Sequence, residues 1–343
     1  MIKEAINTLL NKQDLPDEMA SCVMHSIIEG AVNEVQLATF LTALRMKGES
    51  VSEITAFTNV IRGKATKVYS NKDVIDIVGT GGDSLGTFNI STTSTFVVAG
   101  AGISVAKHGG RSVSSKSGSA DVLEALGVNI NLSVTQTEEI LQQTDMTFMF
   151  APLFHSSMKY VAPTRQKMGI RTVFNILGPL LNPALAKYTL LGVYDEKLLE
   201  PIANVLSNLG IKRALVIHGK DGLDEATLTD KTYVCYLNNG AISRFIIDPV
   251  KLGFNLCNIS DLSGADSYTN AQITLDILSG KELGPKRDIV ILNSALALYI
   301  VLTDKTLEEC IELAKSSINS GLALSKLQQL IKISNEESLH DIR

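Results

Sequence analysis

The sequence predicts an α/β protein in which a small, all-helical N-terminal domain precedes a larger domain built on a mostly parallel sheet. In the first 63 residues, apolar positions recur at three- and four-residue steps with no strand pattern between them, as in amphipathic helices. From residue 73 onward, short apolar runs alternate with helical segments, and this alternation favours parallel strands joined by crossover helices. The last third returns to helices. We therefore expect domains at about residues 1–70 and 71–343.

The N-terminal helices follow from periodicity and stop signals. Apolar positions within residues 20–28 and 35–44 have helical spacing, and Gly30 and Gly48 come after them. Ser52 is expected to cap the next helix. Residues 160–183 are ambiguous, because a helical stretch is followed by apolar residues with two prolines among them. They either belong with the larger domain or cross back to complete the helical one.

The larger domain is predicted element by element. Strands are expected at residues 74–78, 103–106, 147–150, 188–193 and 214–217, with helices at 92–101, 120–126 and 198–209 between them. Residues 233–247 carry Asn-Asn-Gly at their middle, which predicts a hairpin added to the sheet. Helices are then expected at residues 271–278, at 289–302 and from 307 onward.

Composition excludes several classes of protein. The formal charge of −5 argues against a surface that coats nucleic acid. The longest apolar runs, residues 96–103 and 295–302, are shorter than the roughly 18–20 residues of a membrane-spanning helix. The N-terminus lacks a signal-peptide pattern, so we expect a cytoplasmic protein. The four cysteines and five histidines show no metal-ligand spacing, which disfavours disulfides and a transition-metal site.

Two polar segments that follow the first predicted strand are suited to binding phosphate. Residues 79–83 read Gly-Thr-Gly-Gly-Asp, and closely spaced glycines expose successive N–H groups to an anion. A tight turn would use the same glycines. Residues 89–93 read Asn-Ile-Ser-Thr-Thr at the start of a helix, where free N–H groups and hydroxyls bind phosphate. Helix capping alone would explain one of these polar residues.

Two further segments extend the predicted site. Residues 107–119 follow the second strand and contain three cationic side chains, His108, three glycines and five serines. We interpret them as an anion-binding loop at the carboxyl end of a parallel strand, although a solvated loop is also polar. Asp224 and Glu225 lie in a loop after a later strand. An isolated Asp-Glu pair is usually a solvated turn, but beside three phosphate-binding segments it favours Mg²⁺ ligation.

Five motifs resemble those of the anthranilate phosphoribosyltransferases. They are residues 79–83, 89–92, 107–127, 171–183 and 222–225, in order along nearly the whole chain. The resemblance implies a helical domain hinged to an α/β domain, a class shared with pyrimidine nucleoside phosphorylases, and a homodimer built mainly through the helical parts. It implies that phosphoribosyl pyrophosphate (PRPP) gives its phosphoribosyl group to the amine of anthranilate, releasing pyrophosphate, in tryptophan biosynthesis.

The resemblance also implies residue roles. The residues that would bind PRPP are Gly79, Gly82, Asp83, Thr87, Asn89, Ile90, Ser91, Thr92, Lys107, His108, Gly109, Gly110, Arg111, Ser112, Val113, Ser114, Ser115 and Ser119. Those that would bind anthranilate are Gly79, Gly110 and Arg165. Ser91, Asp224 and Glu225 would hold two Mg²⁺ ions per subunit, and Lys107 and His108 are the candidate catalytic residues.

The implied mechanism displaces pyrophosphate from C1′ of the ribose through an oxocarbenium-like transition state. Mg²⁺ and Lys107 would neutralise the charge that grows on the pyrophosphate. His108 would orient the acceptor, relay a proton or only pack. Residues 107–111 read Lys-His-Gly-Gly-Arg, whereas the family has asparagine at the fourth position. Since Gly110 offers no side chain to anthranilate, the sequence leaves acceptor affinity and acceptor identity open.

Two other functions are alternatives. A pyrimidine nucleoside phosphorylase would also break a bond at C1′ but would use free phosphate, and its signature loop differs from residues 116–121 here. A non-catalytic relative that binds nucleic acid should show a basic groove and lose the metal or donor residues. The acidic charge and the presence of Asp224 and Glu225 disfavour this second alternative.

Overall fold

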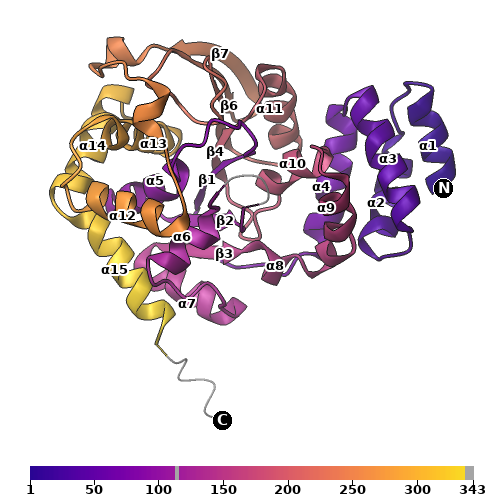
Figure 1. Ribbon diagram of the computed structural model, residues 1–343, viewed down its shortest axis with the longest axis horizontal. Coiled ribbons are helices and arrows are strands. Elements are labelled where there is room, and N and C mark those ends of the chain that lie inside the picture. The colour runs from indigo at the N-terminus through magenta and orange to yellow at the C-terminus, as the bar shows by residue number, and fades with distance from the viewer. Residues whose placement is uncertain (113–115, 337–343) are drawn as a thin grey trace.

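The computed structural model describes residues 1–112 and 116–336 and shows a helical N-terminal part beside a layered α/β part (Figure 1). Helices α1 (Ile2–Leu10), α2 (Asp17–Ile28), α3 (Glu34–Lys47) and α4 (Val51–Lys64) form the first part. The predicted fold class is thereby confirmed. Among the described residues, no helix combines the length and the hydropathy that crossing a bilayer requires.

The predicted N-cap of the fourth helix, Ser52, was wrong. Ser50, not Ser52, is the N-cap: its side chain accepts from the Glu53 backbone N–H, and the Glu53 carboxylate accepts from Ser50 N at 2.8 Å. This reciprocal pair is a capping box, which requires Glu or Gln three residues after the cap. Ser52 lies inside the helix, and its hydroxyl hydrogen-bonds to Asp17.

The central sheet has seven strands in the order β3-β2-β1-β4-β5-β6-β7. The strands are β1 (Ile75–Gly79), β2 (Val105–Gly109), β3 (Met146–Phe150), β4 (Tyr188–Gly192), β5 (Arg213–Gly219), β6 (Thr232–Asn238) and β7 (Ala241–Ile247). The pairs from β3 to β5 are parallel, and β6 and β7 add the predicted antiparallel hairpin. Consequently, the carboxyl ends of five strands meet along one edge.

Helices cover both faces of this sheet (Figure 1). Those sharing an apolar core with Ile75 and Ile77 are α5 (Ile90–Gly100), α6 (Ser119–Ala125), α12 (Ser267–Leu278), α13 (Pro285–Val301), α14 (Leu307–Asn319) and α15 (Leu322–Ser334). On the opposite face lie α10 (Val173–Leu177) and α11 (Leu199–Asn208). The short connecting elements are α8 (Ala151–Phe154), α9 (Ala162–Met168), η1 (Ser156–Tyr160), η2 (Gly178–Leu180), η3 (Glu196–Leu198), η4 (Pro249–Leu252) and η5 (Ile259–Leu262).

Helix α7 (Val134–Thr144) was not expected from the sequence. Its buried residues are Thr137, Ile140, Leu141 and Thr144. Two of these four are threonines, so the apolar stripe that normally identifies a helix is interrupted.

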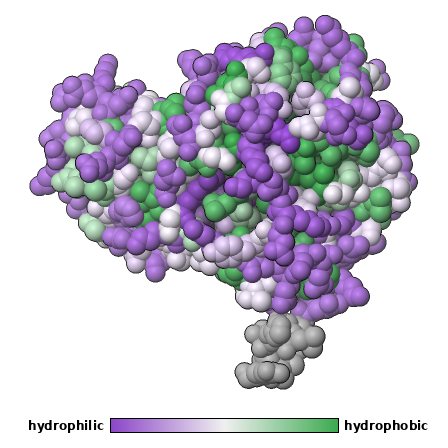
Figure 2. Space-filling model, turned by 180° about the vertical axis from the view of Figure 1, so that it is seen from behind, coloured by the Kyte–Doolittle hydropathy of each residue, from purple (hydrophilic) through white to green (hydrophobic). Residues whose placement is uncertain are grey.

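The ambiguous segment, residues 160–183, packs beside the N-terminal helices. Val161, Phe174 and Leu177 belong to the same apolar core as Phe40 and Phe57. That core also reaches the β4–β6 face of the sheet, so the helical and α/β parts are in direct apolar contact. Seen from behind, hydrophilic residues cover most of the outer surface of both parts, with apolar residues between them (Figure 2).

Candidate active site

The site begins where the adjacent strands β1 and β4 end in glycine. A side chain at either Gly79 or Gly192 would overlap Asp224, which lies across both strand ends. The Asp224 carboxylate accepts from Gly81 N at 2.6 Å, and Thr80 N donates to Gly192 O at 2.9 Å. Strand order reverses direction between β1 and β4, and α/β folds bind ligands in the crevice at such a switch point. Glycine is needed at both positions because the Asp224 carboxylate lies against Gly79 and the Asp224 backbone lies against Gly192.

Glu225 is held beside the first turn of α5. Its carboxylate accepts from Ser91 N at 3.1 Å. The loop itself is fixed by Asn293 of α13, whose amide exchanges hydrogen bonds with the backbone of Ala226 at 3.0 and 2.9 Å. Because of this anchor, both acidic side chains turn inward: Asp224 and Glu225 are each only 8% exposed.

Burial disfavours the charged form of both carboxyl groups. It raises the pKa of Asp224 well above its ordinary range, and the charges of Glu225 and Asp83 raise it further. Burial also raises the pKa of Glu225, against the opposing charge of Lys107. A cation between the two carboxyl groups would favour their charged forms and so offset the free-energy cost of burying them.

The chemistry of the donors fits Mg²⁺. Asp224, Glu225 and the Ser91 hydroxyl present only oxygen atoms. Within residues 1–112 and 116–336, no three His, Cys, Asp or Glu side chains gather as a preformed metal site. Mg²⁺ is commonly bound by one or two carboxylates together with substrate phosphates and water, which matches a site with two acidic residues.

Lys107 lies on β2 and extends into the site. The strand predicted from the sequence ended at residue 106, but β2 continues to Gly109, so that predicted boundary was wrong. A buried lysine is tolerated there because its ammonium donates to Ile77 O at 2.6 Å and lies 3.5 Å from Ser91 Oγ. Burial lowers the pKa of Lys107, while the carboxylates of Asp76 and Glu225 oppose the shift.

His108 faces a partner that sequence reasoning missed. Its ring lies 5.0 Å, centroid to centroid, from the ring of His155, in an edge-to-face arrangement. Burial lowers the pKa of both rings, that of His155 to about 4, so both are neutral near pH 7. Nε2 of each ring has no hydrogen-bond partner among the described residues. His155 lies 47 positions after His108 in the chain, and no local motif marks it.

The segment after β2 is tied to the start of α6. Ser119 Oγ donates to Gly110 O at 3.3 Å. The Arg111 guanidinium pairs with Asp121 and Glu124 of α6 and lies 5.5 Å from the centroid of the Phe150 ring. The Arg111 guanidinium is therefore held against α6. Ser112 N donates to Asp121, and the candidates Val113, Ser114 and Ser115 fall outside the described residues.

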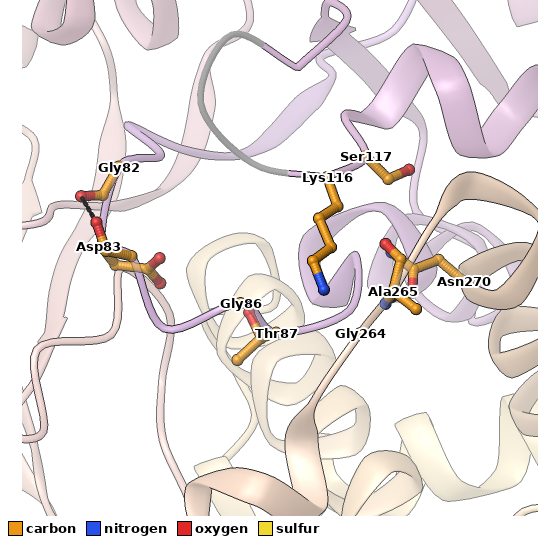
Figure 3. Close-up of a pocket in the computed structure, with 10 residues that line it drawn as sticks. Gly82, Asp83, Gly86, Thr87, Lys116, Ser117, Gly264, Ala265 and Asn270 are labelled. Atoms are coloured by element: carbon orange, nitrogen blue, oxygen red, sulfur yellow. Dashed lines mark hydrogen bonds between the residues drawn. The ribbon is translucent and has the colours of Figure 1, made fainter.

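A cavity of about 290 Å³ opens beside the glycine-rich loop (Figure 3). Asp83 and Thr87, both predicted site residues, line one side. Lys116 and Ser117 come from the predicted anion-binding loop, residues 107–119, whereas the sequence did not suggest the lining residues Gly264, Ala265 and Asn270. Figure 3 shows the Lys116 ammonium directed into the space between Thr87 and Ala265.

Asn270 connects this cavity to the start of α5. Its amide donates to Asn89 Oδ1 at 2.9 Å and its carbonyl accepts from Ala265 N at 2.8 Å. The one sequence signal for Asn270 is its position on the buried side of α12. Asn270 is 2% exposed, and a buried polar side chain normally has hydrogen-bond partners.

Arg165 belongs to a different part of the molecule. It lies on α9, and its guanidinium is 5.3 Å from the centroid of the Phe174 ring. Burial lowers its pKa. Thus the contacts join residues 79–83 (the glycine-rich loop), the start of α5, β2, the start of α6 and residues 222–225 (the acidic loop). Arg165 instead contacts the ring of Phe174, in the segment that packs on the N-terminal helices.

Comparisons with known proteins agree with this arrangement. Residues 3–65 match the helical bundle domain of a glycosyl transferase family, and residues 71–324 match its a/b domain. The anthranilate phosphoribosyltransferase of Ruminiclostridium cellulolyticum is 56% identical, over 98% of both chains. That of Endomicrobium trichonymphae is 54% identical, over 98% of this chain and all of the other.

Solved structures lead to the same family. The anthranilate phosphoribosyltransferase of Thermus thermophilus superposes with a TM-score of 0.91 at 36% identity, covering 97% of this chain and 99% of the other. The Saccharomyces cerevisiae enzyme, solved in complex with PRPP and Mg, has a TM-score of 0.89 at 28% identity over 97% of both chains. With the fold, the acidic pair and these likenesses in agreement, the chain belongs to the anthranilate phosphoribosyltransferases.

Proposed function

We propose that this chain transfers the phosphoribosyl group of PRPP to the amine of anthranilate, releasing pyrophosphate, in tryptophan biosynthesis. The observation that carries the proposal is the convergence of Lys107, Ser91, Asp224 and Glu225 at the carboxyl ends of adjacent strands, in a member of this family. The yeast relatives in complex with PRPP and Mg and with 4-fluoroanthranilate support the same substrates.

The donor would lie against the glycine loop, the start of α5 and the loop that follows β2. The predicted set from Gly79 to Ser119 supplies backbone N–H groups and hydroxyls for its phosphates. The Lys107 ammonium would stabilise negative charge as the bond at C1′ breaks, and its fixed hydrogen bond to Ile77 O means that little reorganisation is needed. Ser91, Asp224 and Glu225 would hold two Mg²⁺ ions. When bound, Mg²⁺ neutralises the pyrophosphate and makes it a better leaving group.

The acceptor would lie near Gly79, Gly110 and Arg165, with the Arg165 cation facing the anthranilate carboxylate. The neutral pair His108 and His155 can orient the amine or accept a proton from it, because neither ring is charged near pH 7. A side chain at Gly110 would meet no heavy atom within 4 Å, so the glycine leaves open space where the family's asparagine would stand.

Assembly, location and domain limits are parts of the same proposal. Three large apolar side chains on α1 and α3 are exposed, namely Leu10 (64%), Val35 (77%) and Met46 (82%). Exposed apolar surface of this kind supports a homodimer through the helical part, and sedimentation would test it.

We further propose a cytoplasmic location and a helical domain of residues 1–70 completed by about 160–183, with residues 71–343 as the α/β domain.

The proposal is tested by following anthranilate fluorescence after mixing the protein with PRPP and Mg²⁺. We expect the fluorescence to decay, and EDTA to abolish the decay. If the protein binds PRPP but the fluorescence stays constant, the proposal fails for this acceptor. Gly110→Asn then separates two causes, since recovery would implicate the loop and continued silence would point to another amine.

A further inference from the structure

The ladder between β1 and β2 is interrupted beside the site. β1 pairs with β4 over five residues, and β2 pairs with β3 over five, but β1 and β2 pair only at Ile75 and Val105. Beyond that point the backbone groups of two central parallel strands would lack partners in the sheet. Buried N–H and C=O groups are almost always paired, so other groups must satisfy them.

Side chains fill this gap. Asp76, the next residue on β1, accepts from His108 N at 3.3 Å. Asn182 donates to the other Asp76 oxygen at 2.7 Å and to Ala106 O at 2.8 Å, and Lys107 Nζ donates to Ile77 O at 2.6 Å. A side-chain network therefore replaces the ladder at the strand ends that carry Lys107 and His108.

Asp76 is the charged centre of this network. It is 1% exposed, and burial raises its pKa to about 6 although the charge of Lys107 and the hydrogen bonds from Asn182 and His108 oppose the shift. Successive side chains of a strand point to opposite faces, so Asp76 and Lys107 lie on opposite sides of the sheet. Because β1 and β2 are not paired at this level, the charges of Asp76 and Lys107 interact between the two strands. The buried surroundings screen this interaction only weakly.

We propose that Asp76 is a positioning residue: with Asn182 it keeps the ends of β1 and β2 apart and holds Lys107 and the His108 backbone in place for reaction. The inference rests on the proposed function, because it assigns to one buried carboxylate the alignment of the donor-side lysine and the acceptor-side histidine. No other carboxylate bridges these two strands among the described residues.

Asp76→Asn is the direct test. Both oxygens of Asp76 accept N–H groups, whereas an amide has one accepting oxygen and would oppose its NH₂ to a donor. We expect kcat to fall by about 10²-fold, with the KM for PRPP changed by less than about threefold, as for an interaction made mainly in the transition state. Calorimetry should still give one PRPP bound per chain in the presence of Mg²⁺, which shows that the loss is not a loss of folded protein.

A double-mutant cycle with Lys107→Met tests whether Asp76 acts through Lys107. Lys107→Met should cost about 10²-fold in kcat in the wild type but less than about fivefold beside Asp76→Asn, because residues that act as a unit are not additive. Independent losses that multiply would overturn the proposal. So would a wild-type kcat in Asp76→Asn.

Two further variants complete the design. Glu53→Gln, which also alters a buried carboxylate that accepts backbone N–H groups, should leave kcat unchanged and so controls for general destabilisation. Should Asp76→Asn not fold, Asn182→Ser replaces it, and we expect kcat to fall by about tenfold with the same non-additivity toward Lys107→Met; an unchanged kcat overturns the proposal.

The proposed function can fail separately. If the wild type does not consume anthranilate, the cycle is measured on PRPP affinity instead. Lys107→Met should then weaken binding in the wild type and have little further effect beside Asp76→Asn. Equal weakening in both backgrounds would overturn the positioning role.

Discussion

Two buried acidic networks in this molecule are built in opposite ways. In the helical part, Glu53 has no exposed side-chain surface and accepts from Lys47 Nζ at 2.7 Å, Leu15 N at 2.9 Å and Ser50 N at 2.8 Å. At the strand ends, Asp224 and Glu225 are also buried, but their nearest charged neighbours include each other and Asp83. The first network pairs opposite charges, whereas the second brings three acidic side chains together with Lys107 as the cation beside Glu225.

This difference distinguishes a structural network from a functional one. A buried carboxylate with a cation and backbone donors is compensated within the protein. Adjacent buried carboxylates with raised pKa values destabilise the fold near pH 7, since the folded state binds their protons more tightly than the unfolded state does. Such a cost is typical of sites whose compensation arrives with the ligand. Mutations should therefore affect activity at the strand ends and stability in the helical part.

The largest expected effect is that of Asp224→Asn on turnover. The amide can still accept from Gly81 N, but the variant loses a negatively charged oxygen that we propose as a Mg²⁺ ligand. We expect kcat/KM for PRPP to fall by about 10²-fold or more, as for lost charge stabilisation in the transition state. Steady-state kinetics with anthranilate measures this, and a value within threefold of the wild type would contradict the metal-binding role.

Glu53→Gln should show the converse behaviour. It leaves the Lys47 ammonium, whose side chain is 4% exposed, with the exposed Asp14 as its one ion-pair partner among the described residues. We expect the free energy of unfolding to fall by about 2–4 kcal/mol, measured by urea denaturation, with kcat and both KM values unchanged. A change in either KM, or unaltered stability, would remove the contrast between the two networks.

The histidine pair gives the site a pH dependence of stability. Burial lowers the pKa of His155 to about 4, below the value of about 6.5 expected in the unfolded chain. The unfolded state therefore binds this proton first, so the contribution is complete above pH 6.5 and is lost as the pH falls toward 4. It amounts to about 3 kcal/mol.

Thermal unfolding across this pH range measures the effect in the wild type and two variants. His155→Gln should flatten the dependence on pH, whereas His25→Gln, at an exposed position of α2, should leave it unchanged. Equal slopes for His155→Gln and the wild type would show that the ring is not buried in its neutral form.

Gly110→Asn is expected to have the smallest effect. The added side chain enters open space and leaves the charged network untouched. One new hydrogen bond to the acceptor is worth about 1 kcal/mol, so the KM for anthranilate should fall by roughly fivefold while the KM for PRPP stays constant. Gly110→Ala is the matched control and should change neither value. A higher KM for anthranilate in Gly110→Asn would show that glycine is needed for access.

Most of the fold was predictable because strands and helices have different apolar periods. The end of β2 was not, since Lys107 and His108 do not look like strand residues; they are accommodated there through contacts with Ile77 and Asp76 that the sequence does not display. Helix α7 was missed because two threonines occupy its buried face.

The candidate site divides in the same way. The glycine-rich loop and the acidic pair are local patterns, so they could be found by chemistry and spacing. His155 and Asn270 come from distant segments and enter the site only through folding, by contact with His108 and Asn89 respectively. A single polar residue within a helix or a short connection carries no local signal for such a role.

The thermal stability of wild type and Asp224→Asn, each titrated with Mg²⁺ and PRPP after treatment with EDTA, tests the contrast most directly. Without ligand, the wild type should have the lower Tm, because its buried acidic pair is uncompensated. As ligand is added, the wild type should rise above the variant, since ligand that binds only the folded state stabilises it. The account is contradicted if the wild type is the more stable protein without ligand, or if both proteins respond equally.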